Sequence, residues 1–181
     1  MNQSYLIGID IGTSACKVAL FDRSGCVLAA ANGDYPVYYP KEGWAEQNPE
    51  EWWSAVCGAV RQVIEEASVA PEEIAGVGID GQSWSAIAID RNGHVLTNTP
   101  IWMDTRAQSI CDRLNEEIGA EAIFEVAGNS LQPSYATAKI LWYKENLPEV
   151  YAKIDKILQS NSFIAFKLTG AVSQDLSQGY G

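Results

Sequence analysis

The sequence predicts an α/β fold with a mixed central sheet and flanking helices. Apolar strand segments turn back on themselves over residues 6–29, an amphipathic helix follows from Pro49, and a short strand at residues 74–79 comes after Pro71. The order strand, strand, strand, helix, strand is typical of α/β domains.

Two stretches of the chain repeat one pattern. Residues 6–29 and 76–97 each run from an apolar strand into Gly-Ile-Asp, turn through glycine and small polar residues, and return along apolar residues to Asp-Arg-x-Gly. In Asp-Arg-x-Gly the aspartate opens a tight turn and the glycine takes a positive φ. The repeat predicts two three-stranded antiparallel meanders, or one meander and a partial copy.

The helix between the repeats has clear start signals. Asn48 is a good N-cap, Pro49 suits the first helical position, and Glu51 can complete a capping box. Apolar residues then recur at helical spacing and predict one buried face. They are Trp52, Val56, Ala59, Val60 and Val63.

The second half of the chain is predicted to be mainly helical. Thr105 is expected to cap a helix that runs to Ile118. A buried strand is expected at residues 154–158, and the helix after it should end at Thr169-Gly170. That last helix covers residues 162–168, and the other predicted helices cover residues 122–126, 135–146 and 148–153.

Charge narrows the class of partner. The 181 residues carry 12 Lys+Arg against 23 Asp+Glu, a formal net charge of −11. Such an acidic surface repels nucleic-acid phosphates and anionic membranes, so we expect neither as a partner. A nucleotide stays compatible, because backbone amides and a metal ion can hold phosphate without a basic surface.

Several features favour a cytoplasmic protein. The first apolar run is interrupted at Asp10, and no window reaches the ~20 apolar residues of a membrane span. The four cysteines are widely spaced and form no CxxC pair, so we expect reduced thiols. The only histidine, His94, lies in a predicted turn, which argues against histidine-based triads and metal sites.

The first turn predicts a phosphate and metal site. Asp10 ends an apolar strand, where a carboxylate is costly unless it binds a metal. Gly12 allows backbone N–H groups to point at an anion, Thr13 and Ser14 add hydroxyl donors, and Lys17 adds a cation on the return strand. Phosphoryl transfer needs this kind of positioning and charge neutralisation. The alternative is a plain hairpin with glycine at the turn.

The second turn carries groups suited to a small polar ligand. Gln82 can donate and accept hydrogen bonds as a sugar hydroxyl requires, Ser83 adds a hydroxyl, and Trp84 can stack on a ring. The alternative is that Trp84 belongs to the core and Gln82 caps the turn.

Residues 101–106 form a third candidate segment. Asp104 could accept two substrate hydroxyls or stabilise the start of the helix that follows. Arg106 could hold Asp104 in place.

Together these motifs resemble the FGGY family of carbohydrate kinases, and are most similar to its xylulokinase-like branch. The resemblance runs in order along essentially the whole chain. It is carried by GIDIGTSACKVALFD, GWAEQNPEEWW, GIDGQSW, IWMDTRA, GNSLQPSYATAKILW and FKLTG.

The resemblance implies a ribonuclease-H-like domain, the architecture shared by actin, hexokinase and the heat-shock chaperone ATPases. It implies that residues 1–181 are the N-terminal domain of a kinase, truncated before its own end, with a separate nucleotide-binding domain. ATP and Mg²⁺ are the expected cofactors and a small sugar the acceptor, first a ketopentose such as xylulose. Asp10 would place Mg–ATP, and Gln82, Ser83, Trp84, Trp102, Asp104 and Arg106 would contact the sugar.

Departures from the family pattern leave the substrate open. Xylulokinases usually carry Gln-Met-His-Gly where this chain has Gln82-Ser83-Trp84-Ser85, so ribulose, gluconate and a polyol remain alternatives. The resemblance also places the catalytic base outside these residues, so we expect the 181-residue chain alone to be inactive. A homodimer is kept open for the full-length protein.

Two other classes of function compete with a kinase. One is a non-catalytic sugar-binding or regulatory protein on the same fold, although no basic DNA-binding segment precedes Tyr5. The other is an actin- or chaperone-like ATPase, which fits the Trp- and Gln-rich second turn less well.

Overall fold

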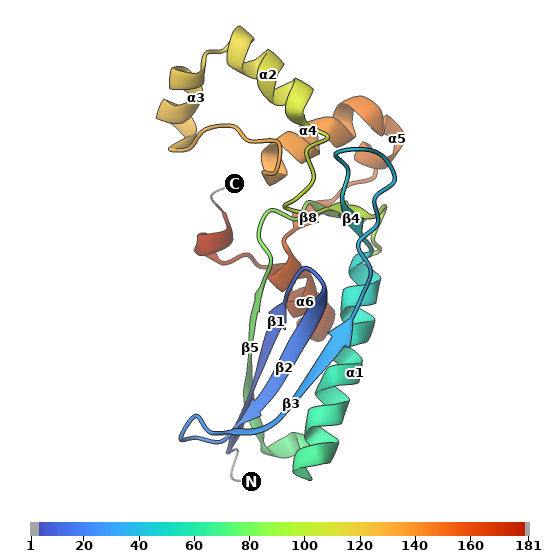
Figure 1. Cartoon of the computed structure of the whole chain (residues 1–181), viewed down its shortest axis with the longest axis vertical. Coiled ribbons are helices and arrows are strands. Elements are labelled where there is room, and N and C mark those ends of the chain that lie inside the picture. Colours follow the sequence, from blue (N-terminus) through green and yellow to red (C-terminus); the bar gives the residue numbers. More distant parts are fainter. Residues whose placement is uncertain (1–3, 180–181) are drawn as a thin grey trace.

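The computed structural model describes residues 4–179, so the ends of the predicted 1–181 domain lie outside it. A four-stranded sheet with the order β3-β2-β1-β5 forms its lower half (Figure 1). Strands β1 (Tyr5–Ile11), β2 (Ala15–Phe21) and β3 (Val27–Asp34) form an antiparallel meander. Strand β5 (Ile74–Gly81) pairs parallel with β1, which confirms the predicted mixed α/β class.

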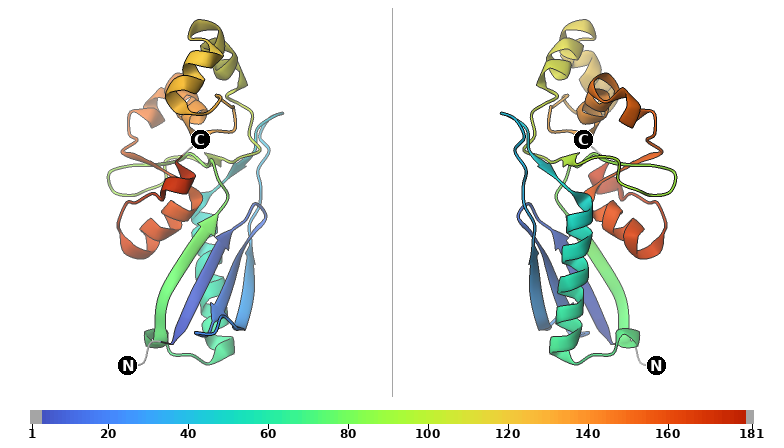
Figure 2. Two further views of the ribbon diagram at one scale, coloured as in Figure 1. Left: turned by 90° about the vertical axis from the view of Figure 1, so that its left-hand side faces the viewer. Right: turned by 90° about the vertical axis from the view of Figure 1, so that its right-hand side faces the viewer.

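One face of the sheet is covered by two helices. Figure 2 shows α1 (Pro49–Ala67) along this face, and α6 (Ser160–Thr169) contacts β5, β1 and α1. Alternate residues of a strand point to opposite faces, so Ile7, Ile9 and Ile11 all enter the core beneath these helices. The predicted apolar face of α1 is confirmed, because Trp52, Val56, Ala59 and Val63 are all buried.

The start of α1 is only partly as predicted. Asn48 is the N-cap, and its side chain accepts a hydrogen bond from the Glu50 N–H at 3.0 Å. The predicted capping box is wrong, since the Glu51 carboxylate accepts from the Tyr38 hydroxyl at 2.8 Å instead of reaching back to Asn48. The helix ends at Ser68, which adopts a left-handed conformation with φ 52°.

The upper half lies beyond the carboxyl ends of β1 and β5 (Figures 1 and 2). A second core there centres on the buried side chains of Trp142 and Tyr143. Its strands pair as β4 (Glu46–Gln47) with β7 (Thr99–Pro100) and β6 (Ile87–Ile89) with β8 (Lys156–Leu158). Its helices are α2 (Gln108–Glu117), α3 (Ala120–Ala127), α4 (Ala136–Asn146) and α5 (Pro148–Tyr151). Short 3-10 helices, η1 (Pro71–Glu73) and η2 (Leu176–Gln178), complete the described elements.

The structure decides between the two alternatives for the repeat and overturns one helix cap. A second three-stranded meander does not form, because β5 joins the first sheet and β6 pairs with β8. One meander and a partial copy do form, since Ile89 pairs antiparallel with Val95 across the second turn. The turn at residues 90–93 does form, with Asp90 accepting at its start. Thr105 does not cap a helix, because α2 begins at Gln108 and the Thr105 hydroxyl donates to the Gly43 carbonyl at 3.1 Å.

The thiols and the histidine are as expected. All four cysteines are free; Cys16 and Cys111 are buried and Cys26 is exposed. His94 is largely exposed and lies 3.3 Å from Asp90. Within residues 4–179, no helix combines the length and apolar character needed to cross a bilayer.

The other face of the sheet carries aligned rows of side chains. Register places Gly8 beside Ala19 and Gly78, and Ala19 beside Ala30, so small residues cross all four strands. These residues line a groove of about 660 Å³. The next row towards the turn is polar and consists of Asp80, Asp10, Lys17 and Asn32.

Close packing of α1 on β3 leads to a stability prediction. A Cβ added at Gly33 would lie 2.8 Å from both the Cβ and the carbonyl oxygen of Ala55, whereas one at Gly78 would meet nothing within 4 Å. We expect Gly33→Ala to lower the unfolding free energy by about 1–3 kcal/mol through overpacking, and Gly78→Ala to change it by less than about 0.5 kcal/mol. Urea unfolding followed by tryptophan fluorescence measures both, and equal effects would contradict this packing.

Candidate functional site

The two predicted turns meet at one edge of the sheet. β1 and β5 run parallel in register, so the turn after Ile11 and the segment after Gly81 emerge side by side. The Gln82 N–H donates to the Ile11 carbonyl at 2.8 Å and joins them directly. Ligands of open α/β sheets bind outside the carboxyl ends of parallel strands, which is where these turns lie.

The first turn is held by backbone contacts from both sides. The Gly12 N–H donates to the Ala15 carbonyl at 3.1 Å, and a Cβ at Gly12 would lie 2.9 Å from that oxygen, so the turn requires glycine. The Tyr35 hydroxyl donates to the Gly12 carbonyl at 2.6 Å, and the Gln47 amide donates to the Thr13 carbonyl at 2.8 Å. The turn is therefore fixed before any ligand binds.

Two carboxylates and a cation lie on the open face just below this turn. Asp10 is the register partner of Lys17 on one side and of Asp80 on the other. Mg²⁺ is commonly bound by one or two carboxylates together with phosphate oxygens, so Asp10 and Asp80 are chemically suited to it. Within residues 4–179, no cluster of three or more His, Cys, Asp or Glu side chains is placed to hold a metal ion. The protein would therefore supply at most two side-chain ligands at such a site. Asp80 belongs to the second Gly-Ile-Asp of the repeat and was not among the predicted site residues. The parallel pairing of β1 with β5 places it beside Asp10.

Gln82 links the second turn to the first. Its Nε2 donates to Oε1 of Gln47 at 2.8 Å, and Gln47 is fully buried. Its backbone carbonyl accepts from the Ser160 hydroxyl at 2.7 Å. Its Oε1 is buried and accepts no hydrogen bond from the described residues. Gln47 was not expected to be the link between the two turns.

Trp84 adopts an unusual backbone conformation. Its φ is 61°, in the left-handed region that non-glycine residues rarely occupy. Its ring lies against Tyr135 with the centroids 4.9 Å apart. Ser83 is half-buried on the same segment. A bulky residue in this conformation needs support from its surroundings, and such residues cluster at ligand sites.

Trp102 connects the predicted sugar and phosphate residues. Its Nε1 donates to the Thr13 hydroxyl oxygen at 3.0 Å, and the side chain is 44% exposed. Ser14, next to Thr13, is exposed. The indole therefore offers an open apolar surface directly beside the turn hydroxyls.

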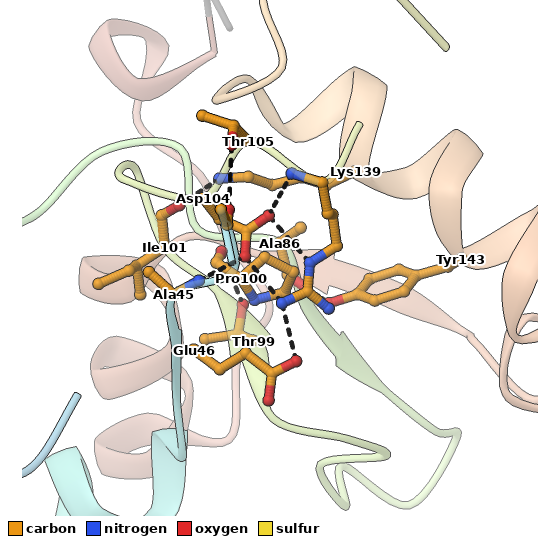
Figure 3. A network of polar contacts seen from close by, with 12 residues as sticks. Ala45, Glu46, Ala86, Thr99, Pro100, Ile101, Asp104, Thr105, Lys139 and Tyr143 are labelled. Carbon is orange, nitrogen blue, oxygen red and sulfur yellow. Dashed lines mark hydrogen bonds and ion pairs between the residues drawn. The ribbon is translucent and has the colours of Figure 1, made fainter. Parts of the chain in front are cut away.

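Asp104 lies inside a buried network of polar contacts (Figure 3) and not at the surface. Its Oδ2 accepts from the Ala45 N–H at 2.7 Å, and both oxygens accept from Arg106. The side chain has no exposed surface. This geometry does not support the predicted bidentate contact with substrate hydroxyls, and α2 starts too late for Asp104 to cap it.

Arg106 is the buried charged partner of Asp104. Its guanidinium lies 2.7 Å from Asp104 and 2.8 Å from Glu46, and its side chain is 3% exposed. It also stacks on the Trp44 and Trp142 rings, 3.8 and 4.9 Å from their centroids. Burial lowers the pKa of Arg106, but the hydrogen bonds and charges of Asp104 and Glu46 outweigh it and raise the pKa. The predicted pairing with Asp104 is confirmed, whereas contact of Arg106 with a substrate does not fit its burial.

A buried lysine that was not among the predicted site residues completes the network. Lys139 of α4 has no exposed surface, and its Nζ donates to the carbonyls of Trp84 at 2.7 Å and Ile101 at 2.8 Å. Burial is the main reason that its pKa is lowered to about 7; the charge of Asp104 raises it and that of Arg106 lowers it.

The buried ion pairs lead to a prediction with a surface control. Arg106→Met should lower the unfolding free energy by about 3–5 kcal/mol, because it leaves the Asp104 charge buried without its partner. Arg113 pairs with Glu145 on the surface with its side chain 46% exposed, so Arg113→Met should cost less than about 1 kcal/mol. Denaturant unfolding of both variants checks this, and comparable losses would argue against the buried network.

The lowered pKa of Lys139 predicts a pH-dependent stability. Unfolded lysine titrates near pH ~10.4, whereas folded Lys139 titrates at about 7. Between these values the unfolded state binds more protons, so the unfolding free energy of the wild type should rise with pH. Relative to Lys139→Met, the rise should approach about 1.4 kcal/mol per pH unit, measured by urea unfolding from pH 6 to about pH 10. A difference that does not change with pH would contradict this.

Comparison with known proteins places this geometry in a family. Residues 5–179 match the N-terminal domain of the FGGY family of carbohydrate kinases. The chain is 32% identical to a xylulose kinase of Bacillus subtilis over 98% of its length, and 30% identical to a glycerol kinase of Thermococcus gammatolerans over 97%.

A solved structure agrees with the sequence comparison. The crystal structure of gluconate kinase from Lactobacillus acidophilus matches 98% of the chain with a TM-score of 0.90 and 29% identity, and 35% of that chain is covered. The chain spans about a third of the length of the two curated relatives, 35% and 36%. The family match, the shared fold and the order of its motifs show that this chain belongs to the FGGY family of carbohydrate kinases.

Proposed function

We propose that this chain supplies the sugar-binding and phosphate-binding part of an ATP-dependent sugar kinase. The contact between Trp102 Nε1 and the Thr13 hydroxyl, 3.0 Å long, carries the proposal. It joins an exposed aromatic surface suited to a sugar to the glycine turn suited to a phosphate. A kinase must hold acceptor and phosphate within reacting distance, and this contact sets their two surfaces edge to edge.

The turn residues have separate roles in this proposal. The Thr13 hydroxyl accepts from Trp102, so its own proton is available to a phosphate oxygen. Gly12 allows the tight turn, but its N–H is already bonded to the Ala15 carbonyl, so the hydroxyls of Thr13 and Ser14 are the phosphate donors. Lys17 adds positive charge one row below. Asp10 and Asp80 would hold Mg²⁺, which when bound neutralises charge on the phosphate oxygens.

The sugar side of the site would be lined by Gln82, Ser83, Trp84 and Trp102. The partly exposed indole of Trp102 can stack on a carbon face of the sugar. Gln82 supports this side of the site through its bonds with Gln47 and Ser160. Asp104 and Arg106 serve this site from below by holding residues 101–106 in place. The group that takes the sugar hydroxyl proton is expected in the part of the kinase beyond these residues.

We propose a ketopentose such as xylulose as the acceptor, with ribulose, gluconate and a polyol as alternatives. The relatives with similar identity are named xylulose kinase, glycerol kinase and gluconate kinase, so identity alone does not select one. ATP as donor, cytoplasmic location and a homodimer of the longer protein belong to the same proposal.

Tryptophan signals test this site directly. The chain has six tryptophans, and Trp52 is fully buried in the lower core. In ¹⁵N–¹H spectra, D-xylulose should shift the indole signals of Trp84 and Trp102 and leave Trp52 unchanged. Trp102→Phe should weaken binding by about 2- to 13-fold, the value of one aromatic contact, because it removes part of the stacking surface.

Glycerol and D-gluconate serve as competing probes in the same titration. Stronger shifts with either would move the acceptor to that class, and no shift with any of the three would contradict the sugar site. Samples supplied with MgATP should release no sugar phosphate; turnover by this chain would show that the catalytic base lies within it.

A further inference from the structure

Lys139 reaches from α4 to two segments that carry the proposed sugar site. The first, residues 82–86, connects β5 to β6, and the second, residues 101–107, connects β7 to α2. Neither is a helix or a strand, so no repeating backbone ladder sets its shape. Segments of this kind depend on side chains for their conformation.

The lysine bonds one carbonyl from each segment. Its Nζ lies 2.7 Å from the Trp84 carbonyl oxygen and 2.8 Å from that of Ile101, and the side chain is completely buried. One acceptor belongs to Trp84 itself, and the other immediately precedes Trp102. A single ammonium therefore fixes the distance between the backbones of the two tryptophans.

Of the two residues whose carbonyls Lys139 bonds, Trp84 has the unusual backbone conformation. A left-handed φ of 61° is unfavourable for a residue with a large side chain, so it needs contacts that hold it. The ring of Tyr135 holds the side chain of Trp84, and Lys139 holds its carbonyl. One turn further along α4, the Tyr143 hydroxyl donates to the Ala86 carbonyl at 2.9 Å and secures the end of the same segment.

Lys139 differs from the apolar residues of the core because its side chain can carry a charge. A buried ammonium is costly unless it is well hydrogen-bonded, and a purely apolar residue of similar size would fill the space at less cost. The charged groups that act on it are Asp104, which favours its charged form, and Arg106, which opposes it. Its hydrogen bonds to the two carbonyls explain why a lysine, and not an apolar residue, occupies this buried position.

We propose that Lys139 is a positioning residue of the sugar site, which sets the Trp84 and Trp102 surfaces at the separation that the sugar requires. The proposal rests on the proposed function for its ligand but not for its geometry. Lys139 does not contact the sugar; it acts through the backbones of residues 84 and 101.

The test compares Lys139→Met with Val63→Ala. Methionine keeps the length and apolar stem of lysine but donates no hydrogen bond. Val63→Ala removes buried volume near the C-terminal end of α1, in the core beneath the sheet. In Lys139→Met without sugar, the indole signals of Trp84 and Trp102 should shift, and amides of residues 82–86 and 101–106 should exchange at least about tenfold faster. Affinity for D-xylulose should fall by at least about tenfold. Val63→Ala should lower the melting temperature while leaving these signals, exchange rates and affinity within about twofold of the wild type.

Each outcome decides the proposal. Unchanged indole signals and exchange rates in Lys139→Met would overturn it, whether or not the wild type binds sugar. If the wild type binds none of the three probe sugars, the proposed function fails, while faster exchange confined to the two segments would still support the positioning role. Should Lys139→Met not fold, Lys139→Leu, which also donates no hydrogen bond, replaces it with the same expected results. Failure of both to fold would assign Lys139 to the folding core and overturn the proposal.

Discussion

The buried carboxylate of Asp104 is the contact on which the upper half of the molecule depends. It accepts from the Ala45 backbone and from Arg106, and thereby joins two segments that are 59 residues apart in the sequence. Arg106 extends the same connection to Glu46 and to the rings of Trp44 and Trp142. Because these groups are charged and out of water, removing one partner costs far more than a surface pair would.

Side-chain amides of Gln47 and Gln82 connect this network to the turn at the edge of the sheet. Gln47 follows Glu46 on β4, donates to the Thr13 carbonyl and accepts from Gln82. Trp102 precedes Asp104 by two residues and bonds the Thr13 hydroxyl. The proposed phosphate turn is thus held by the same segments that the buried ion pairs fix, so the site is set by long-range contacts and not by the turn alone.

This division explains how much could be predicted from the sequence. The strands of residues 6–29, the N-cap at Asn48 and the end of α6 at Gly170 depend on neighbouring residues, and the structure confirms them. The capping box at Glu51 and the cap at Thr105 were wrong, because partners distant in the sequence took over the groups involved. The sequence also left open whether the repeat forms a full second meander, which depended on the distant pairing of β6 with β8. Lys139 could not be found, since its acceptors lie 55 and 38 residues away.

The row of small residues across the open face of the sheet has a thermodynamic consequence. Gly78, Gly8, Ala19 and Ala30, with exposed neighbours such as Leu6 and Leu28, stay hydrated in the folded chain. Unfolding therefore exposes less new apolar surface than the length of the chain suggests, and the heat-capacity change scales with that surface. The stability curve of this chain is accordingly flatter with temperature than that of a domain whose sheet is covered on both faces.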